Sequence, residues 1–365
     1  MIYRTSKSDI DKYRENPALS QSDLKKLLLG LDAFTKEEPE SESLPMIIGS
    51  AVDTILTGQK GDFEKEFYIS TVTKPSDTME AMLVAIYNDA PDKNLGLDDL
   101  KDLVEEVVTD FNYQPNWKIE TRISKVVENF GYYEELKASA GKTVISLDTM
   151  TIIDNVVNSL QTNPVTASLF STTERANIDF YYQLPIFWEY MGVNCKGLID
   201  LVIVEKDMEG LVRSVTSYDL KTMSESTLKF IDSVKKRRYD IQAAWYTYGL
   251  LNCKELPFSS TNNLKPFKFI VESTTNPGRP IIYECSEEIL NCGFTGIPEL
   301  IIEGRVIRKN IIGFSQLMEL YLYYEKEGWE EEKSILESNG RMILNWDTVG
   351  YYKDTENGDK IWQEI

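Results

Sequence analysis

The chain has 365 residues, of which 42% are hydrophobic and 27% are charged, and Gly and Pro together contribute only 33. This composition excludes disordered, collagen-like and low-complexity proteins. The 59 acidic and 39 basic residues give a net charge of −20, which argues against a globally positive surface that coats nucleic acid but leaves room for a local basic groove. The apolar stretches fall far short of the roughly 20 residues that cross a bilayer, and residues 1–16 lack the apolar core of a signal peptide. We therefore expect a cytoplasmic protein with no membrane partner.

Histidine is absent from the chain. Its absence excludes Ser/His/Asp and Cys/His catalysis and zinc sites of the HExxH type. Any catalysis must use carboxylates, lysines, tyrosines or hydroxyls. The four cysteines form no CxxC pair, and we expect them to be small buried apolar side chains.

The first part of the chain is predicted to be helical. Ser20 followed by Asp23 predicts a capping box at the start of a helix. Residues 36–45 are charged and contain proline, which favours a loop, and residues 46–56 fit a buried helix. These belong to an N-terminal part, 1–64, of the main domain. Residues 65–163 are predicted to form a mainly helical insertion or cap. Their sequence contains no internal repeat.

The composition changes after residue 163, where β-branched and aromatic residues alternate with short polar turns. Three consecutive strands are predicted over 178–184, 193–204 and 211–220, with 205–210 as a hairpin loop. A helix over 240–251, strands over 267–272 and 280–285, and a helical region over 286–365 with an acidic face at 319–337 follow. The predicted fold class is α/β, with a central mixed β-sheet flanked by helices and its core in 164–285.

The chemically informative residues lie at the ends of two predicted neighbouring strands. Asp219 and Lys221 are two residues apart in a strand and so share a face. An antiparallel neighbour can bring Asp200 close to them. Two carboxylates beside a lysine suit Mg²⁺ or Mn²⁺ and can align a water on a phosphodiester. Gln242 and Tyr246, four residues apart, share a face of the next helix.

Together these motifs resemble the PD-(D/E)XK nuclease superfamily, in particular its RecB-like and RecE-like phage recombination exonucleases. The matching segments are SQSDL at 20–24, GSAVD at 49–53, KGLID at 196–200, DLKT at 219–222 and QAAWY at 242–246. The match spans most of the chain and is loosest over 65–160.

The resemblance implies a restriction-endonuclease-like core and a metal-dependent DNA exonuclease that digests linear duplex DNA in phage recombination. Asp200 and Asp219 would bind metal, Lys221 would orient or activate water, and Gln242 and Tyr246 would support the site or contact a phosphate. It also implies a cytoplasmic location in the host, a homo-oligomer, and a single-strand annealing protein as a partner. The alternatives are an endonuclease or processing nuclease with the same site, or a catalytically weakened module that binds nucleic acid or protein.

Two acids extend the implied metal site. Asp53 stands where the family has histidine, so it would add a carboxylate ligand or mark weakened catalysis. The resemblance implies that Glu174 corresponds to an accessory acid of the family; the alternative is an ordinary surface charge. Ile199 replaces the usual proline. The cysteines do not have the spacing of the iron–sulfur relatives, so no cluster is expected.

A basic segment between the Asp-x-Lys strand and the Gln242 helix contrasts with the acidic chain. It is either an ordinary charged surface or a strip that contacts the DNA backbone. Its members are Lys229, Lys235, Lys236, Arg237 and Arg238.

Overall fold

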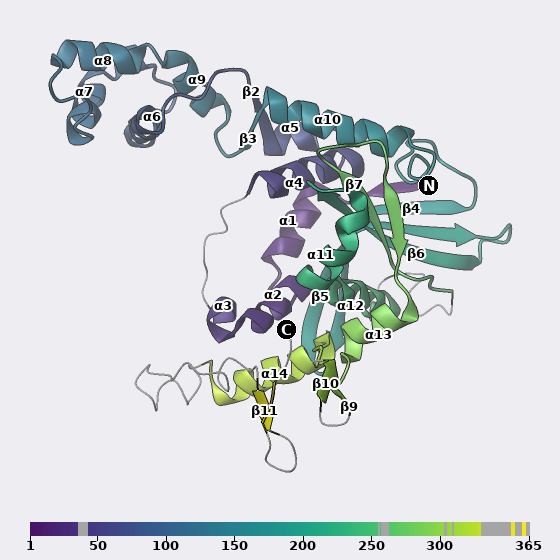
Figure 1. Cartoon of the computed structure of the whole chain (residues 1–365). Helices are drawn as coiled ribbons and strands as arrows, with labels where there is room; N and C mark the ends of the chain where they lie inside the picture. Colours follow the sequence, from purple (N-terminus) through teal and green to yellow (C-terminus); the bar gives the residue numbers. More distant parts are fainter. Residues whose placement is uncertain are drawn as a thin grey trace. The chain divides into compact units, whose positions relative to one another are not determined.

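The computed structural model describes residues 1–35, 43–254, 256, 263–302, 305–308, 310–329, 352–354 and 360–362. They form two compact units, Met1–Ser43 with Ser159–Ile365, and Leu44–Asn158 (Figure 1). Most of the predicted loop at 36–45 and the predicted acidic face beyond residue 329 lie outside the described residues. Among the described helices, none combines the length and apolar character that a membrane span requires.

The first unit is built on a six-stranded mixed sheet in the order β1-β4-β5-β6-β7-β8. Its strands are β1 (Ile2–Arg4), β4 (Ile178–Tyr190), β5 (Val193–Lys206), β6 (Val212–Met223), β7 (Lys268–Ser273) and β8 (Ile281–Glu284). β4, β5 and β6 form an antiparallel meander, while β1 runs parallel to β4 and β7 runs parallel to β6. The mixed sheet with its flanking helices confirms the predicted fold class.

The parallel pairing of β6 and β7 requires a crossover, which α11 and α12 supply. The helices of this unit are α1 (Lys7–Glu15), α2 (Gln21–Lys26), α3 (Leu31–Thr35), α11 (Phe230–Arg237), α12 (Tyr239–Asn252), α13 (Glu287–Thr295) and α14 (Phe314–Glu327), with short 3₁₀ turns at Leu27–Leu29 and Thr227–Lys229. The predicted capping box begins α2, since Ser20 Oγ accepts the Asp23 N–H and Asp23 Oδ2 accepts the Ser20 N–H.

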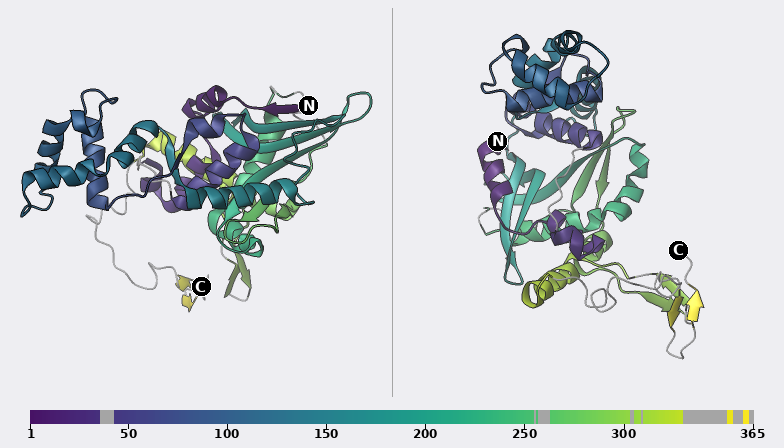
Figure 2. Two further views of the ribbon diagram at one scale, coloured as in Figure 1. Left: turned by 90° about the horizontal axis from the view of Figure 1, so that it is seen from above. Right: turned by 90° about the vertical axis from the view of Figure 1, so that its left-hand side faces the viewer.

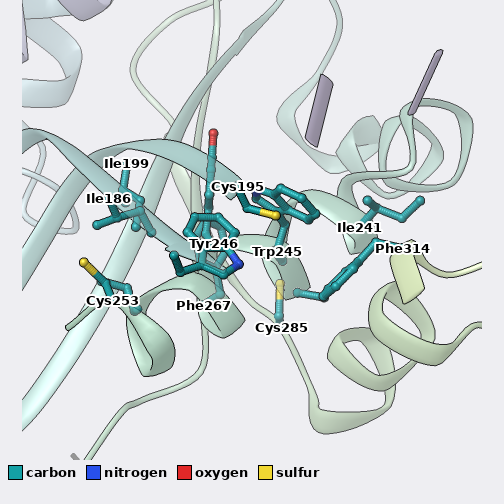
Figure 3. Packing of buried hydrophobic residues seen from close by; sticks show 14 of the residues in the cluster. Ile186, Cys195, Ile199, Ile241, Trp245, Tyr246, Cys253, Phe267, Cys285 and Phe314 are labelled. Carbon is teal, nitrogen blue, oxygen red and sulfur yellow. The ribbon is translucent and has the colours of Figure 1, made fainter. Parts of the chain in front are cut away.

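Helix α12 lies in the centre of the core of this unit. It packs against β4, β5 and α13, which are labelled in Figure 1. Figure 2 shows the same fold from two further directions. Trp245 is fully buried among the apolar side chains drawn in Figure 3, and its indole N–H donates to the Lys196 carbonyl at 3.0 Å. Burial on almost every side fixes the helix, and therefore its polar side chains, relative to the sheet.

Some short strands were not expected from the sequence. β1 precedes the first helix, and two small hairpin sheets occupy the region predicted to be helical over 286–365. They pair β9 (Leu300–Ile302) with β10 (Arg305–Arg308) and β11 (Tyr352–Asp354) with β12 (Lys360–Trp362). Strands of three or four residues leave too little periodicity to identify from the sequence.

The second unit is mainly helical, as predicted for most of it, and has its own apolar core around Met82, Leu83, Val104 and Tyr133. It contains α4 (Leu44–Thr57), α5 (Asp62–Glu66), β2 (Phe67–Ser70), α6 (Asp77–Asp89), a 3₁₀ turn (Leu97–Asp99), α7 (Lys101–Asp110), α8 (Ile119–Val127), α9 (Phe130–Ala138), β3 (Thr143–Ser146) and most of α10 (Leu147–Thr162). The parallel pair β2 and β3 was not predicted.

Candidate active site

The central sheet opens between β5 and β6. The two strands pair up to Leu201 and Tyr218, although both continue past that point. In the same register the next pair is Asp200 and Asp219. At this position the backbone hydrogen bonds between the two strands have ended, and the side-chain atom Asp200 Oδ2 accepts the Leu220 N–H at 2.7 Å. A carboxylate therefore occupies the place of a backbone acceptor, and the two aspartates lie on adjacent strands where the sheet divides.

Asp219 has a separate partner for each carboxylate oxygen. Gln242 Nε2 donates to Oδ1 at 2.6 Å, and Lys221 Nζ lies 2.5 Å from Oδ2. The side chain is only 4% exposed. The contact with Lys221 confirms that residues 219 and 221 point the same way. It is an ion pair without aligned hydrogen-bond geometry, so the buried Oδ2 accepts no regular hydrogen bond among the described residues.

The charge state of Lys221 follows from its surroundings. Burial lowers the pKa of the ammonium, but Asp219, Tyr239 and Asp200 more than offset this effect and raise the pKa above its ordinary value. The ammonium also lies 5.0 Å from the centre of the Tyr239 ring. Lys221 is therefore a cation at neutral pH, suited to orienting a water or stabilising negative charge.

Tyr246 lies on α12, four residues after Gln242, and is 7% exposed. Burial, and next the charge of Asp219, raises the pKa of its phenol well above the usual range, so it is neutral and can only share its proton through a hydrogen bond. A Cβ at Gly197 would lie 3.0 Å from the Tyr246 ring and 3.3 Å from Ile186. The glycine of the KGLID segment thus leaves the space that the tyrosine ring occupies.

Lys196, in the same KGLID segment, has a structural role. Its ammonium donates to the backbone carbonyls of Tyr13, Arg14 and Asn16 at 3.0, 3.2 and 2.5 Å. These groups lie at the C-terminal end of α1, where carbonyls lack helical partners and a cation is favourable. Lys196 fixes α1 to the sheet.

Two residues near the site were not singled out in the sequence. Gln183 on β4 lies opposite Asp200, and its Nε2 is 3.4 Å from Asp200 Oδ1. Lys25 on α2 donates to the Arg237 carbonyl at 3.3 Å and lies 6.0 Å from the centre of the Tyr239 ring. Burial, and next the cation of Lys221, lowers the pKa of Lys25 to about 8. The dense charge of the DLKK segment could have suggested Lys25, whereas no sequence signal marks Gln183.

The two acids predicted to extend the metal site lie in different units, Glu174 in the first and Asp53 in the second. Glu174 is exposed and precedes Ile178, which pairs with Glu205. Glu205 is five residues along β5 from Asp200, or about 16 Å at the usual strand rise. Asp53 belongs to the second unit, where its carboxylate accepts the Thr57 hydroxyl at 3.1 Å. The roles of Asp53 and Glu174 as metal ligands stay predictions.

The basic segment is only partly available to a ligand. Lys235, Lys236 and Arg237 are exposed on α11, and Lys229 is exposed and paired with Glu225 at 3.4 Å. Arg238 instead makes internal contacts. Its guanidinium donates to Asp240 at 3.0 and 2.8 Å and to the Ile312 carbonyl at 2.6 Å. Arg238 is therefore held by internal contacts, whereas the other four bases of the segment are exposed.

The donor set fits a hard divalent cation. Mg²⁺ is commonly held by one or two carboxylates and completes its octahedron with water and substrate phosphate. Asp200 and Asp219 supply two carboxylates, and the buried Asp219 Oδ2 has lone pairs that no regular hydrogen bond uses. The described residues contain no group of three or more His, Cys, Asp and Glu side chains placed to hold a metal. A Mg²⁺ ion would use the two carboxylates and complete its coordination with water and substrate.

Comparison with known proteins gives little further information. No family model matches the sequence, and no curated protein matches it. Among solved structures, the chain is similar to a crystal structure from Eubacterium rectale described as "Putative exonuclease", with a TM-score of 0.44 and 12% identity over 95% of this chain and 98% of that chain. These values are too low to transfer a function, which must come from the geometry of the site.

Proposed function

We propose that the protein is a Mg²⁺- or Mn²⁺-dependent deoxyribonuclease that hydrolyses phosphodiester bonds of linear duplex DNA. The observation that carries this proposal is the arrangement around Asp219, whose buried Oδ2 lies 2.5 Å from the Lys221 ammonium at the point where β5 and β6 separate. Asp200 lies at the same point on the neighbouring strand and accepts the Leu220 N–H. Two carboxylates with one cation are the components that metal-assisted phosphoryl hydrolysis requires.

Asp200 and Asp219 would hold the metal, which supplies a Lewis acid for the phosphate and lowers the pKa of a bound water. Gln242 fixes Asp219 through its 2.6 Å hydrogen bond. In the reaction the oxygen of water bonds to phosphorus while the bond from phosphorus to the leaving oxygen breaks. The leaving oxygen gains a proton and the attacking water loses one. Lys221 carries a positive charge and would stabilise the charge that develops on the phosphoryl oxygens.

The exposed bases of α11 offer a path for the DNA backbone. Lys235, Lys236 and Arg237 follow the Asp219 strand and precede the Gln242 helix, and the Arg237 carbonyl accepts from Lys25. Local cations of this kind can bind phosphates even when the whole protein is acidic. We further propose a role in phage-type recombination, with a homo-oligomer and a single-strand annealing protein as partners, on the basis of the motif resemblance.

Incubation with end-labelled linear and covalently closed circular duplex DNA tests this function. Degradation of the linear DNA alone in Mg²⁺, abolished by EDTA, is the expected result. Cleavage of the circle would indicate an endonuclease with the same site. Binding of DNA without cleavage of either substrate in Mg²⁺ or Mn²⁺ would overturn the enzymatic proposal in favour of a binding module.

A further inference from the structure

Gln183 has an unusual backbone conformation for its position. It lies within β4 with a φ of 52°, in the left-handed region, and is 6% exposed. A side chain other than glycine rarely adopts this conformation, particularly inside a strand, and the conformation persists only when its surroundings enforce it. Such strain often accumulates at functional sites.

The pairing of the strands does not account for this conformation. Tyr182 pairs with Leu201 and Leu184 pairs with Ile199, so β4 and β5 keep one register on both sides of Gln183. A bulge would have shifted that register by one residue. Asn177 and Met191 also have positive φ, but they lie outside the strands, before β4 and in the turn between β4 and β5. Between these two pairs Gln183 lies opposite Asp200, and its amide approaches the Asp200 carboxylate.

The two oxygens of Asp200 are approached from two different strands. Gln183 Nε2 on β4 lies 3.4 Å from Oδ1, and the Leu220 N–H on β6 donates to Oδ2 at 2.7 Å. The hydrogen bond from Leu220 fixes one oxygen of the carboxylate. A donor beside the other oxygen restricts rotation of the carboxylate further. Carboxylate ligands of metals are commonly oriented by such partners.

We propose that Gln183 is a positioning residue, held in a strained conformation so that its amide orients Asp200 for a divalent cation. This inference rests on the proposed function, because it assigns Asp200 to the metal. Gln183 itself does not contact the reacting atoms. Its effect passes through the carboxylate of Asp200.

The pair of variants Gln183→Ala and Gln183→Gly separates positioning from stability. Both remove the amide, but only glycine relieves the positive φ, so Gln183→Gly should be more stable than Gln183→Ala in urea denaturation. Met191→Ala and Met191→Gly form the matched control, because Met191 has the same φ of 52° in an exposed turn. The control pair should show the same order of stability.

Two further readouts are measured on the folded proteins, namely Mn²⁺ affinity by calorimetry and hydrogen exchange of the Leu220 amide without metal. Both Gln183 variants should bind Mn²⁺ about 10- to 100-fold more weakly than the wild type. The Leu220 amide hydrogen should also exchange faster in them. Both Met191 variants should match the wild type in both measurements. Wild-type affinity and protection in the Gln183 variants would overturn the inference. If instead the proposed function is wrong, wild type and Asp200→Asn should bind Mn²⁺ equally. Hydrogen exchange of the Leu220 amide would still show whether Gln183 orients Asp200.

Discussion

Asp200 accepts the backbone N–H of Leu220 through its side chain, at 2.7 Å, where the ladder between β5 and β6 ends. The Leu220 N–H is satisfied, although β5 no longer offers a carbonyl to it. The bond also ties the Asp-x-Lys segment to the strand that carries Asp200. The flanking side chains of residues 219 and 221 therefore remain on one face, beside the opening of the sheet.

Replacement of Lys221 by alanine should act on the chemical step. Loss of a positioned charge or proton-transfer group typically lowers the rate by about 100- to 10,000-fold, and we expect this loss in single-turnover hydrolysis with saturating DNA. Lys196→Met is a suitable control, because the Lys196 ammonium donates to backbone carbonyls at the end of α1 and its loss should lower stability instead. A defect of Lys221→Ala confined to DNA affinity would reassign the lysine to phosphate binding.

Neutralisation of α11 should change the salt dependence of DNA binding. In the variant Lys235→Gln/Lys236→Gln/Arg237→Gln, the slope of log affinity against log salt should flatten by roughly 0.9 for each phosphate that the protein no longer neutralises. Arg238 is left intact, since its contacts with Asp240 and Ile312 are internal. A charge-matched triple variant of Lys7, Lys12 and Arg14 on α1 is the control. An unchanged slope in the α11 variant would place the DNA path elsewhere.

Lys25 should make stability depend on pH in the alkaline range. Burial, followed by the charge of Lys221, lowers its pKa to about 8 in the folded protein, against about 10.4 in an unfolded chain. At pH values between these two pKa values the unfolded state binds more protons than the folded state. The free energy of unfolding of the wild type should therefore rise with pH in this range, when compared with that of Lys25→Met. Urea denaturation from pH 7 to 10.5 measures this. Lys25→Arg, which stays charged, should lack the rise, and a rise of equal size in that variant would refute the assignment.

Gly197→Ala should destabilise the protein and disturb the site. The added methyl would lie 3.0 Å from the Tyr246 ring and 3.3 Å from Ile186, and overpacking of this kind typically costs about 1–3 kcal/mol. Gly131→Ala is the opposite control, because the nearest side-chain atom to its added methyl is 3.9 Å away, in Val72, and alanine is favoured in a helix. Denaturation midpoints that move the same way for both variants would contradict the packing assigned to Gly197.

The strands and their chemistry were predictable where the sequence pattern is regular. Alternating β-branched and aromatic residues marked β4, β5 and β6, and the two-residue spacing placed Asp219 and Lys221 on one face, as the ion pair confirms. The burial of all four cysteines also agrees with the expectation. The contact of Gln242 with Asp219 agrees with the predicted association of the Gln-x-x-x-Tyr helix with the Asp-x-Lys strand.

Other features depend on contacts that no local pattern encodes. The positive φ of Gln183 is a backbone property that no sequence pattern marks. The internal role of Arg238 depends on Asp240 and on a carbonyl 74 residues away. Lys25 reaches Tyr239 from a helix more than 200 residues earlier in the chain.

The most direct test is hydrolysis of end-labelled linear duplex DNA by wild type, Asp200→Asn and Asp219→Asn at saturating Mg²⁺. Each substitution removes a charged oxygen ligand with little change in shape, and circular dichroism checks that the fold is retained. We predict Mg²⁺-dependent cleavage by the wild type and its loss in both variants. Cleavage by either variant at close to the wild-type rate would contradict the assignment of this site.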